Sequence, residues 1–256
     1  MKNSNVIFMK INEYWLLTLI GVILFFVIWE ISSIMLSSIY FPQPLSIVSR
    51  FYQMVVNGTL TPDIFASMER LLLGFGLAVV VGIPLGIVTG VSRRTQILLS
   101  PTIELFRYIS PIALFPLFIL IFGIGLSSKV VMIFWVAWAP ILINTTQGIK
   151  NVNPVLIKAA KSLGAKPLTI VSKVMIPSAT PYIISGLRVG IGVSFLALVA
   201  AEMIGANSGL GFLVLQSAES FHLLNMYVGI MTLSILGFLS NYAFLLLEKR
   251  FKRYMA

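Results

Sequence analysis

Long uninterrupted apolar stretches dominate the hydrophobic pattern of this chain. Six of them occur, each about 20 residues long, which is the length a helix needs to cross the hydrocarbon core of a bilayer. They cover residues 15–35, 70–91, 103–122, 129–148, 181–204 and 226–247. The period-two alternation that a closed membrane β-barrel requires is absent. The pattern therefore predicts an all-α polytopic membrane protein with six transmembrane helices.

The first apolar stretch follows Lys2 and Lys10 and could be mistaken for a signal peptide. It is longer than a typical signal core, and no clear small-x-small cleavage site follows it. We therefore expect a retained membrane anchor.

Composition agrees with lipid as the main solvent. Of the 256 residues, 58% are hydrophobic and only 10% are charged, and the mean hydropathy is +1.00. A soluble domain of this size needs more charge to cover its surface. The absence of cysteine excludes disulfides, thiolate metal sites and cysteine nucleophiles. With His222 as the single histidine we expect no metal site, and we expect His222 itself on the surface.

The basic residues predict how the chain is oriented. The net charge is +10. If the N-terminus is cytosolic, the cytosolic segments hold most Lys and Arg, whereas the external segments hold little beyond Arg50, Arg70 and Lys129. This is a strong positive-inside asymmetry, so both termini and residues 149–178 should be cytosolic. The charge thus reflects topology, and without an aromatic-and-basic strip we expect no nucleic-acid partner.

The segments between the spans differ in character. Residues 41–68 should be external and contain a short surface helix, while residues 205–225 should be external, glycine-rich at first and amphipathic afterwards. Residues 149–178 form the longest cytosolic loop. Because no domain boundary or internal repeat is visible, we expect one transmembrane domain over residues 1–256, with its core at 60–250.

The cytosolic loop carries the most specific local pattern. A short helix containing Lys158, Ala159 and Ala160 should end at Gly164, because glycine adopts the left-handed conformation that closes a helix. A second short helix should begin near Pro167, and Pro177 should stop it before the next span. By pattern alone, the loop is either an ordinary connector or a surface that docks into a partner's groove.

This loop resembles the signature loop of the permeases of binding-protein-dependent ABC importers. The matching positions are Ala159, Ala160, Gly164 and Pro177, with Leu163 and Ala165 beside the glycine, whereas Lys158 stands where the family usually has an acid. The resemblance extends over roughly residues 41–250 and is to the branch that imports nitrate, sulfonates and taurine. It rests further on Phe41-Pro42-Gln43-Pro44, Gly82-Ile83-Pro84-Leu85-Gly86, Pro116-Leu117, Phe122-Gly123-Ile124-Gly125, Ser128-Lys129, Ala201-Glu202-Met203-Ile204-Gly205 and Gly209-Leu210-Gly211.

The resemblance implies a type I importer fold in a bacterial inner membrane. It implies a second copy of the permease around one pore, two ATPase subunits that bind ATP and Mg, and an external substrate-binding protein. The loop would be the coupling helix on the ATPase. This chain lacks the G-x-x-x-x-G-K-[ST] phosphate cradle, so we expect neither ATP hydrolysis nor a cofactor on it. The implied cargo is a small oxyanion, or alternatively a neutral or cationic nutrient such as a thiamine-precursor pyrimidine.

Ionisable residues at membrane depth are candidates for function, because each is costly there unless it is paired or hydrated. Glu104 and Arg107 are three residues apart and can form a salt bridge, with Arg188 as a further partner; alternatively the arginines line a path for an anion. Glu202 suits a structural or gating role, for instance bonded to backbone near Gly205.

Small and polar residues add further candidates for the pore. Tyr108, Ser110 and Pro111 interrupt the third span early, and the resemblance places this stretch beside the translocation path. Ser110 could instead bond to its own helix. Glycines spaced by four residues indicate close helix contacts, either movable or static. They are Gly82, Gly86 and Gly90 in the second span and Gly186 and Gly190 in the fifth.

Two other classes of protein remain as rivals. A secondary transporter or channel should show inverted repeats and broken helices at matched positions, which the sequence lacks. A membrane enzyme should cluster acids, histidines or a nucleophile near one face, but the eight acidic residues are scattered. An ATP-driven importer permease is the interpretation that we carry forward.

Overall fold

The computed structural model describes residues 2–36 and 40–253, with side chains over 16–36 and 40–251. This described part is helical and contains no β-strand. Five of its helices are long and apolar enough to cross a membrane, and counting a sharply bent pair of shorter helices as one span gives six. The prediction of an all-α chain with six spans is confirmed, with one correction to the third span.

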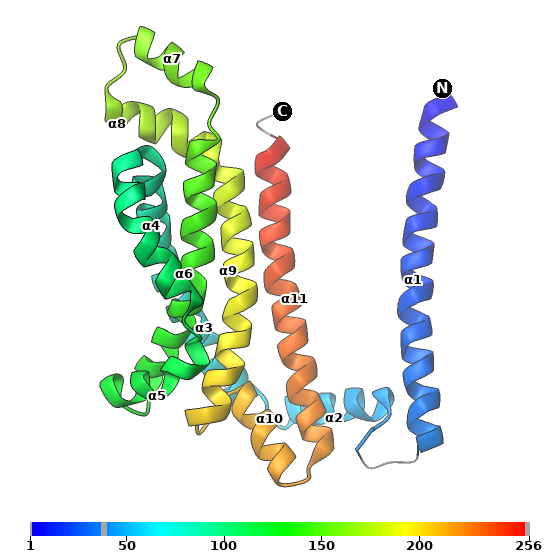
Figure 1. Ribbon diagram of the computed structural model, residues 1–256. Coiled ribbons are helices and arrows are strands. Elements are labelled where there is room, and N and C mark those ends of the chain that lie inside the picture. Colours follow the sequence, from blue (N-terminus) through cyan, green and yellow to red (C-terminus); the bar gives the residue numbers. More distant parts are fainter. Residues whose placement is uncertain (1, 37–39, 254–256) are drawn as a thin grey trace.

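Three helices form the centre of the bundle. They are α3 (Thr61–Val91), α6 (Leu126–Lys150) and α9 (Ile176–Gly205), which pack side by side (Figure 1). The core lies between them and is built largely from their aliphatic and alanine side chains. The last span, α11 (Leu223–Arg253), runs along α9. Most other apolar side chains face outward, as they do when lipid is the solvent.

Glycines allow α3 to approach α6 closely. A Cβ atom added at Gly86 would lie 2.6 Å from Thr145 Cβ and 2.8 Å from the carbonyl oxygen of Leu142. Gly82 and Gly90 are similarly close to α6. In the fifth span, a Cβ at Gly186 would lie 2.7 Å from Asn144 Cβ, and one at Gly190 would lie 3.0 Å from Ile141 Cγ1. All five predicted glycines thus lie where two helix backbones meet.

The third span is not the single helix predicted over 103–122. It consists of α4 (Arg93–Tyr108) and α5 (Pro111–Phe122), which meet at 94°. Ile109 and Ser110 between them are extended, with ψ of 122° and 121°. Proline disfavours the helical conformation of the residue before it, so Pro111 accounts for the break at Ser110. The interruption was predicted at this point, but not the size of the bend.

The N-terminal part lies to one side of the bundle. Helix α1 (Lys2–Leu36) stands apart in Figure 1 and is linked to the rest through α2 (Pro44–Val56). The ring of Trp29 lies 5.9 Å from that of Phe41 and 6.4 Å from that of Tyr227. Helix α2 is the short helix predicted within residues 41–68. The next span begins at Thr61, earlier than the predicted residue 70.

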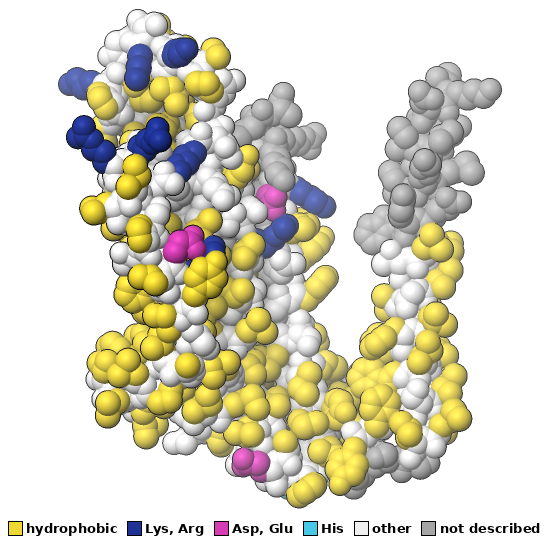
Figure 2. Space-filling view, in the orientation of Figure 1, with side chains coloured by type: hydrophobic (Ala, Val, Ile, Leu, Met, Phe, Trp, Pro, Cys, Tyr) yellow, Lys and Arg dark blue, Asp and Glu magenta, His cyan; other side chains and the backbone are white. Residues whose placement is uncertain are grey.

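The two ends of the bundle differ. One end carries α7 (Pro154–Ser162) and α8 (Pro167–Ile170), and α1 begins and α11 ends at this same end (Figure 1). Lys and Arg side chains gather over it (Figure 2). The opposite end carries α5 and α10 (Leu210–Glu219).

One boundary near α8 was predicted wrongly. Pro177 does not stop the second short helix, because the five-residue π-helix η1 (Val171–Met175) joins α8 directly to α9. Pro177 lies in the first turn of α9, and the segment from Pro167 to Gly205 is one apolar helical span. A π segment shifts the hydrogen-bond pattern locally, which allows the helix to continue through a proline that would otherwise end it.

Candidate functional site

The loop between α6 and α9 is a helix, a glycine turn and a second helix. Asn153 caps α7, since its side-chain oxygen accepts a hydrogen bond of 2.9 Å from the N–H of Val155. At the other end Gly164 has φ +74°. The Gly164 N–H donates to the Lys161 carbonyl, and the Ala165 N–H donates to the Ala160 carbonyl. This pair of bonds is a Schellman motif, and it is the turn predicted from the glycine.

Apolar side chains on this loop project away from the bundle. Leu163 is 88% exposed and Leu168 is 79% exposed, and Val155 is also exposed. Lys158, Lys161 and Lys166 lie on the same loop, as do Ala159 and Ala160, which keep the face of α7 smooth. Leucines that stay exposed at the charged end of a membrane protein are candidates for contact with another protein. Lys158 makes no ion pair within the described part of the chain.

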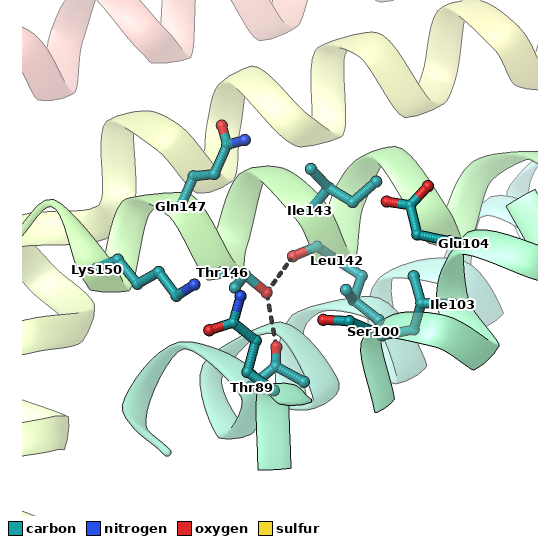
Figure 3. A pocket seen from close by; sticks show the side chains of 10 residues that line it. Thr89, Ser100, Ile103, Glu104, Leu142, Ile143, Thr146, Gln147 and Lys150 are labelled. Atoms are coloured by element: carbon teal, nitrogen blue, oxygen red, sulfur yellow. Dashed lines mark hydrogen bonds between the residues drawn. The ribbon is translucent and has the colours of Figure 1, made fainter. Parts of the chain in front are cut away.

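A polar cavity lies between α3, α4 and α6 in the half of the bundle nearest this loop; we call it the inner cavity (Figure 3). Its volume is about 180 Å³. Seven of its ten lining residues are polar or charged: Thr89, Gln96, Ser100, Glu104, Thr146, Gln147 and Lys150. Such a concentration of polar groups between membrane helices indicates a hydrated cavity.

Most residues that line the inner cavity were not predicted from the sequence. Gln96, Ser100 and Glu104 recur every four residues, so they share one face of α4. Thr146 and Lys150 follow the same rule on α6. This regular polar stripe was a signal that the sequence contained. Thr146 also links helices, because its hydroxyl lies 2.6 Å from that of Thr89.

The predicted pair on α4 is present. Arg107 Nη2 lies 3.0 Å from Glu104 Oε2, and both side chains are substantially exposed in this single chain, at 38% and 51%. Arg107 also donates to the hydroxyl of Tyr108, and its guanidinium stacks on that ring. Ser110 is the N-cap residue of α5, with no side-chain cap bond. These residues surround the bend between α4 and α5.

Arg188 does not pair with Glu104, the partner considered from the sequence. Its Nη1 lies 3.0 Å from Glu248 Oε2, so it joins α9 to α11 rather than to Glu104. Arg107 and Arg188 therefore belong to two separate ion pairs.

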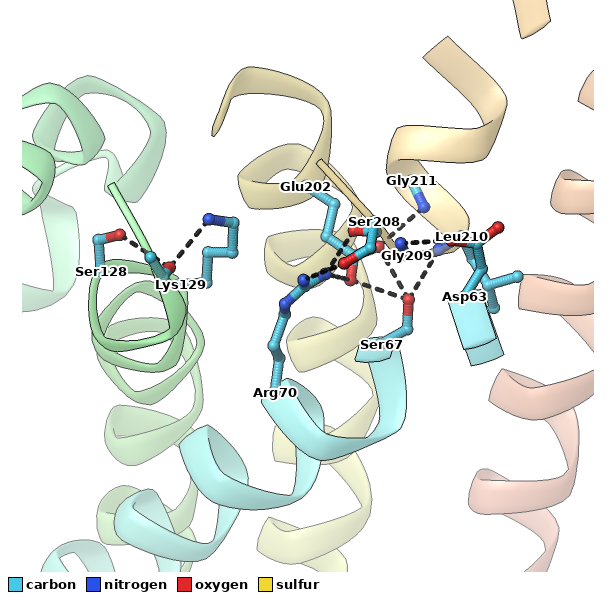
Figure 4. Close-up of polar contacts among 11 residues, drawn as sticks. Asp63, Ser67, Arg70, Ser128, Lys129, Glu202, Ser208, Gly209, Leu210 and Gly211 are labelled. Carbon is cyan, nitrogen blue, oxygen red and sulfur yellow. Dashed lines mark hydrogen bonds and ion pairs between the residues drawn. The ribbon is translucent and has the colours of Figure 1, made fainter. Parts of the chain in front are cut away.

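A buried polar cluster lies at the opposite end of the bundle, where α3, α9 and α10 meet (Figure 4). We call it the outer cluster. Its centre is Glu202, which is fully buried and accepts hydrogen bonds from the hydroxyl of Ser67, the guanidinium of Arg70 and the N–H of Gly211. The predicted backbone bond of Glu202 therefore exists, but it comes from Gly211 and not from near Gly205.

The same cluster fixes the start of α10. Ser67 accepts a bond from the Leu210 N–H, and Asp63 accepts one from the Gly209 N–H. Arg70 donates to the carbonyl and the hydroxyl of Ser208. Arg70 thereby holds the end of α9 and the start of α10 together. The sequence singled out Glu202 but none of these partners.

Comparison with known proteins agrees with this architecture. A family model for the binding-protein-dependent transport system inner membrane component matches residues 82–253. The taurine transport system permease of Escherichia coli is 36% identical over 228 residues, covering 87% of this chain and 83% of the relative. A putative aliphatic sulfonates transport permease of Bacillus subtilis is 34% identical over 214 residues, covering 84% and 78%.

A solved structure of the same fold exists. An inward-facing structure of the MetNI methionine ABC transporter contains a chain with a TM-score of 0.68 and 22% identity, covering 75% of this chain and 95% of that one. The family match spans the inner cavity, the α7–α8 loop and the C-terminal spans. This chain therefore belongs to the family of binding-protein-dependent transport system inner membrane components, the permease subunits of ABC importers.

Proposed function

We propose that this permease imports a small sulfonate or related oxyanion, working as a homodimer with two ATPase subunits and an external binding protein. Both termini and the α7–α8 loop lie in the cytosol of the bacterial cell in this proposal. The observation that carries it is the helix–glycine–helix loop, which presents exposed leucines at the basic end of the bundle. ATP and Mg bind the partner subunits, and this chain performs no covalent chemistry.

The loop suits the transmission of force. The Schellman turn at Gly164 holds α7 at a fixed angle to α8, and α8 continues through η1 into α9. A displacement of α7 by the ATPase would therefore move α9 and the helices packed against it. This motion would expose the path to one side of the membrane at a time.

The inner cavity supports an anionic cargo. Lys150 supplies a positive charge, and the amides of Gln96 and Gln147 and the hydroxyl of Ser100 supply hydrogen-bond donors for oxyanion oxygens. Glu104 also lines the cavity, and Arg107 offsets its charge at 3.0 Å. The sulfonate and taurine permeases among the relatives favour the same class of cargo.

A neutral or cationic nutrient is the second candidate. Glu104 and the two amides could bind a ring nitrogen and its amino group, as a thiamine-precursor pyrimidine would offer. The two candidates predict opposite effects of Glu104→Gln: weaker uptake of a cation and retained uptake of an anion.

Uptake by the reconstituted transporter tests the proposal. Proteoliposomes containing the permease, its ATPase and its binding protein should accumulate radiolabelled taurine or methanesulfonate only when ATP is supplied. Accumulation of a pyrimidine with no sulfonate uptake would replace the proposed cargo. ATP-independent accumulation would contradict the importer mechanism itself.

A further inference from the structure

Beside the outer cluster lies a second cavity of about 280 Å³, the outer cavity. Its walls come from the start of α6, from α3 and from the chain between α9 and α10. The polar groups that line it are Glu69, Arg70, Lys129, Asn207 and Ser208. It lies at the end of the bundle opposite the α7–α8 loop, so in the proposed orientation it faces the side from which cargo arrives.

Lys129 is a buried cation without an acidic partner in the described part of the chain. The residue is only 3% exposed, and its Nζ donates one hydrogen bond, 2.9 Å long, to the carbonyl of Gly125 (Figure 4). An ammonium group has three donors, so two remain. No carboxylate among the described residues lies within 4.0 Å of Nζ. A buried charge in this condition is costly unless an anion or water compensates for it.

Arg70 lines the same cavity and is already fixed in place. Glu202 and Ser208 take three hydrogen bonds from its guanidinium, which leaves two of its five N–H groups without an acceptor in the described chain. A guanidinium held in this way loses little freedom when it binds a further oxyanion oxygen. Ser208 adds a hydroxyl to the same wall.

Glu69 is the one acid that lines the outer cavity, and it is exposed. Its carboxylate is therefore solvated and weakens the positive potential only partly. Glu202 is paired with Arg70 and does not line the cavity. Among the described residues, Lys129 is therefore the buried cation that lines the cavity without forming an ion pair.

We propose that the outer cavity is an anion-binding site, with Lys129 as its principal charge and Arg70 and Ser208 as its hydrogen-bond donors. This inference rests on the proposed function: the site receives the sulfonate group of the cargo before the path opens. Lys129 thus determines specificity at the external mouth, at the opposite end of the bundle from the coupling loop. The volume suits a small sulfonate.

The absence of native cysteine allows a direct test. A single cysteine at the exposed, cavity-lining Asn207 is labelled with a neutral maleimide in the complete transporter in nanodiscs. Methanesulfonate should slow the labelling of the permease several-fold, whereas uncharged dimethyl sulfone should not. This comparison keeps Lys129 in place, so it does not depend on whether a Lys129 variant folds. Equal protection by both compounds, or by neither, would overturn the proposal.

Variants then assign the charge. Lys129→Met in the Asn207→Cys background should abolish the protection, and Lys129→Arg should retain part of it. Glu69→Gln should increase the protection at low ionic strength, because it removes the negative charge that lines the cavity. Arg50→Gln is the matched control, because Arg50 is an arginine of the same end of the bundle that is bonded to Asn225 and Gln53, away from this cavity. Undiminished protection in a folded Lys129→Met protein would refute the role of Lys129.

Uptake measured in parallel separates the two proposals. Sulfonate uptake by the Asn207→Cys protein, without protection of its introduced cysteine, would leave the proposed function standing and defeat the outer site. Protection without any sulfonate uptake would support the site and defeat the proposed cargo. If Lys129→Met raises the KM for methanesulfonate uptake while ATPase assembly is normal, both stand.

Discussion

Arg70 Nη1 and Glu202 Oε1 lie 2.5 Å apart, although 132 residues separate them along the chain. The pair joins the start of α3 to the end of α9, and Ser208 and Gly211 extend it to α10. Three helices are therefore tied together at one end by a single buried carboxylate. The α7–α8 loop lies at the opposite end, so the proposed motion of α9 would be accommodated between the two ends.

Removing one member of this pair should be strongly destabilising. Glu202→Ala leaves the Arg70 charge without its partner and the Gly211 N–H without an acceptor, so we expect a loss of about 3–5 kcal/mol in the free energy of unfolding. Arg70→Ala should cost a similar amount. The double variant should lose much less than the sum, as a denaturation double-mutant cycle would reveal. Additive losses would mean that the pair is not coupled.

The pair of Glu104 and Arg107 should behave in the opposite way. Both side chains are substantially exposed in the subunit, and exposed pairs at this helical spacing contribute little. The free energies of unfolding of Glu104→Ala and Arg107→Ala should thus be close to that of the native protein, when measured in the same assay as the Arg70 variants. If the two variants lose transport activity instead, Glu104 and Arg107 line the translocation path. A stability loss as large as that of Glu202→Ala would show that the pair is buried in the assembled permease.

The contact between α3 and α6 should not tolerate a methyl group. Gly86→Ala places a Cβ 2.6 Å from that of Thr145, so the helices must separate, at a cost of about 1–3 kcal/mol. Gly76→Ala is the matched control on the same helix, because its Cβ would meet nothing within 4 Å. Alanine there should be neutral or stabilise by up to ~1 kcal/mol. Thermal unfolding of the two variants makes the comparison, and equal melting temperatures would refute the close packing.

Cysteine labelling tests the membrane orientation that we propose from the basic residues. Lys161→Cys on α7 should react with a membrane-impermeant thiol reagent only after the cells are permeabilised. His222→Cys, at the exposed turn after α10, should react in intact cells. Labelling of both positions in intact cells would contradict the six-span topology. Labelling of position 161 but not of position 222 in intact cells would mean that the orientation is the opposite of the one proposed.

The features visible in the sequence were local ones. The apolar runs specified the spans, and Gly164 specified the turn of the loop, because both depend only on nearby residues. The bend at Ser110 was predictable from Pro111, but its 94° angle depends on how α4 and α5 pack. The helix across Pro177 was missed because the π segment before it leaves no simple mark in the sequence.

Ion pairs between different helices could not be predicted in the same way. Arg188 was considered with Glu104 but bonds to Glu248, which is 60 residues away. Glu202 was recognised as costly at membrane depth, yet its partner Arg70 depends on the packing of α3 against α9. Such pairings are set by tertiary contacts between spans. The spacing of Gln96, Ser100 and Glu104 contained the signal of a polar face, which lines the inner cavity, but that face was not predicted from the sequence.

The central claim is that the α7–α8 loop couples this permease to an ATPase, and substitution of Gly164 tests it most directly. Gly164 has φ +74°, and Gly58 has φ +70° in the turn between α2 and α3, with open space around both positions. Valine at either site imposes similar backbone strain, but only Gly164→Val distorts the loop. In proteoliposomes with the ATPase and binding protein, Gly164→Val should lose cargo-stimulated ATP hydrolysis and uptake, while Gly58→Val retains both. Normal coupling in Gly164→Val would contradict the account and leave the loop as a simple connector.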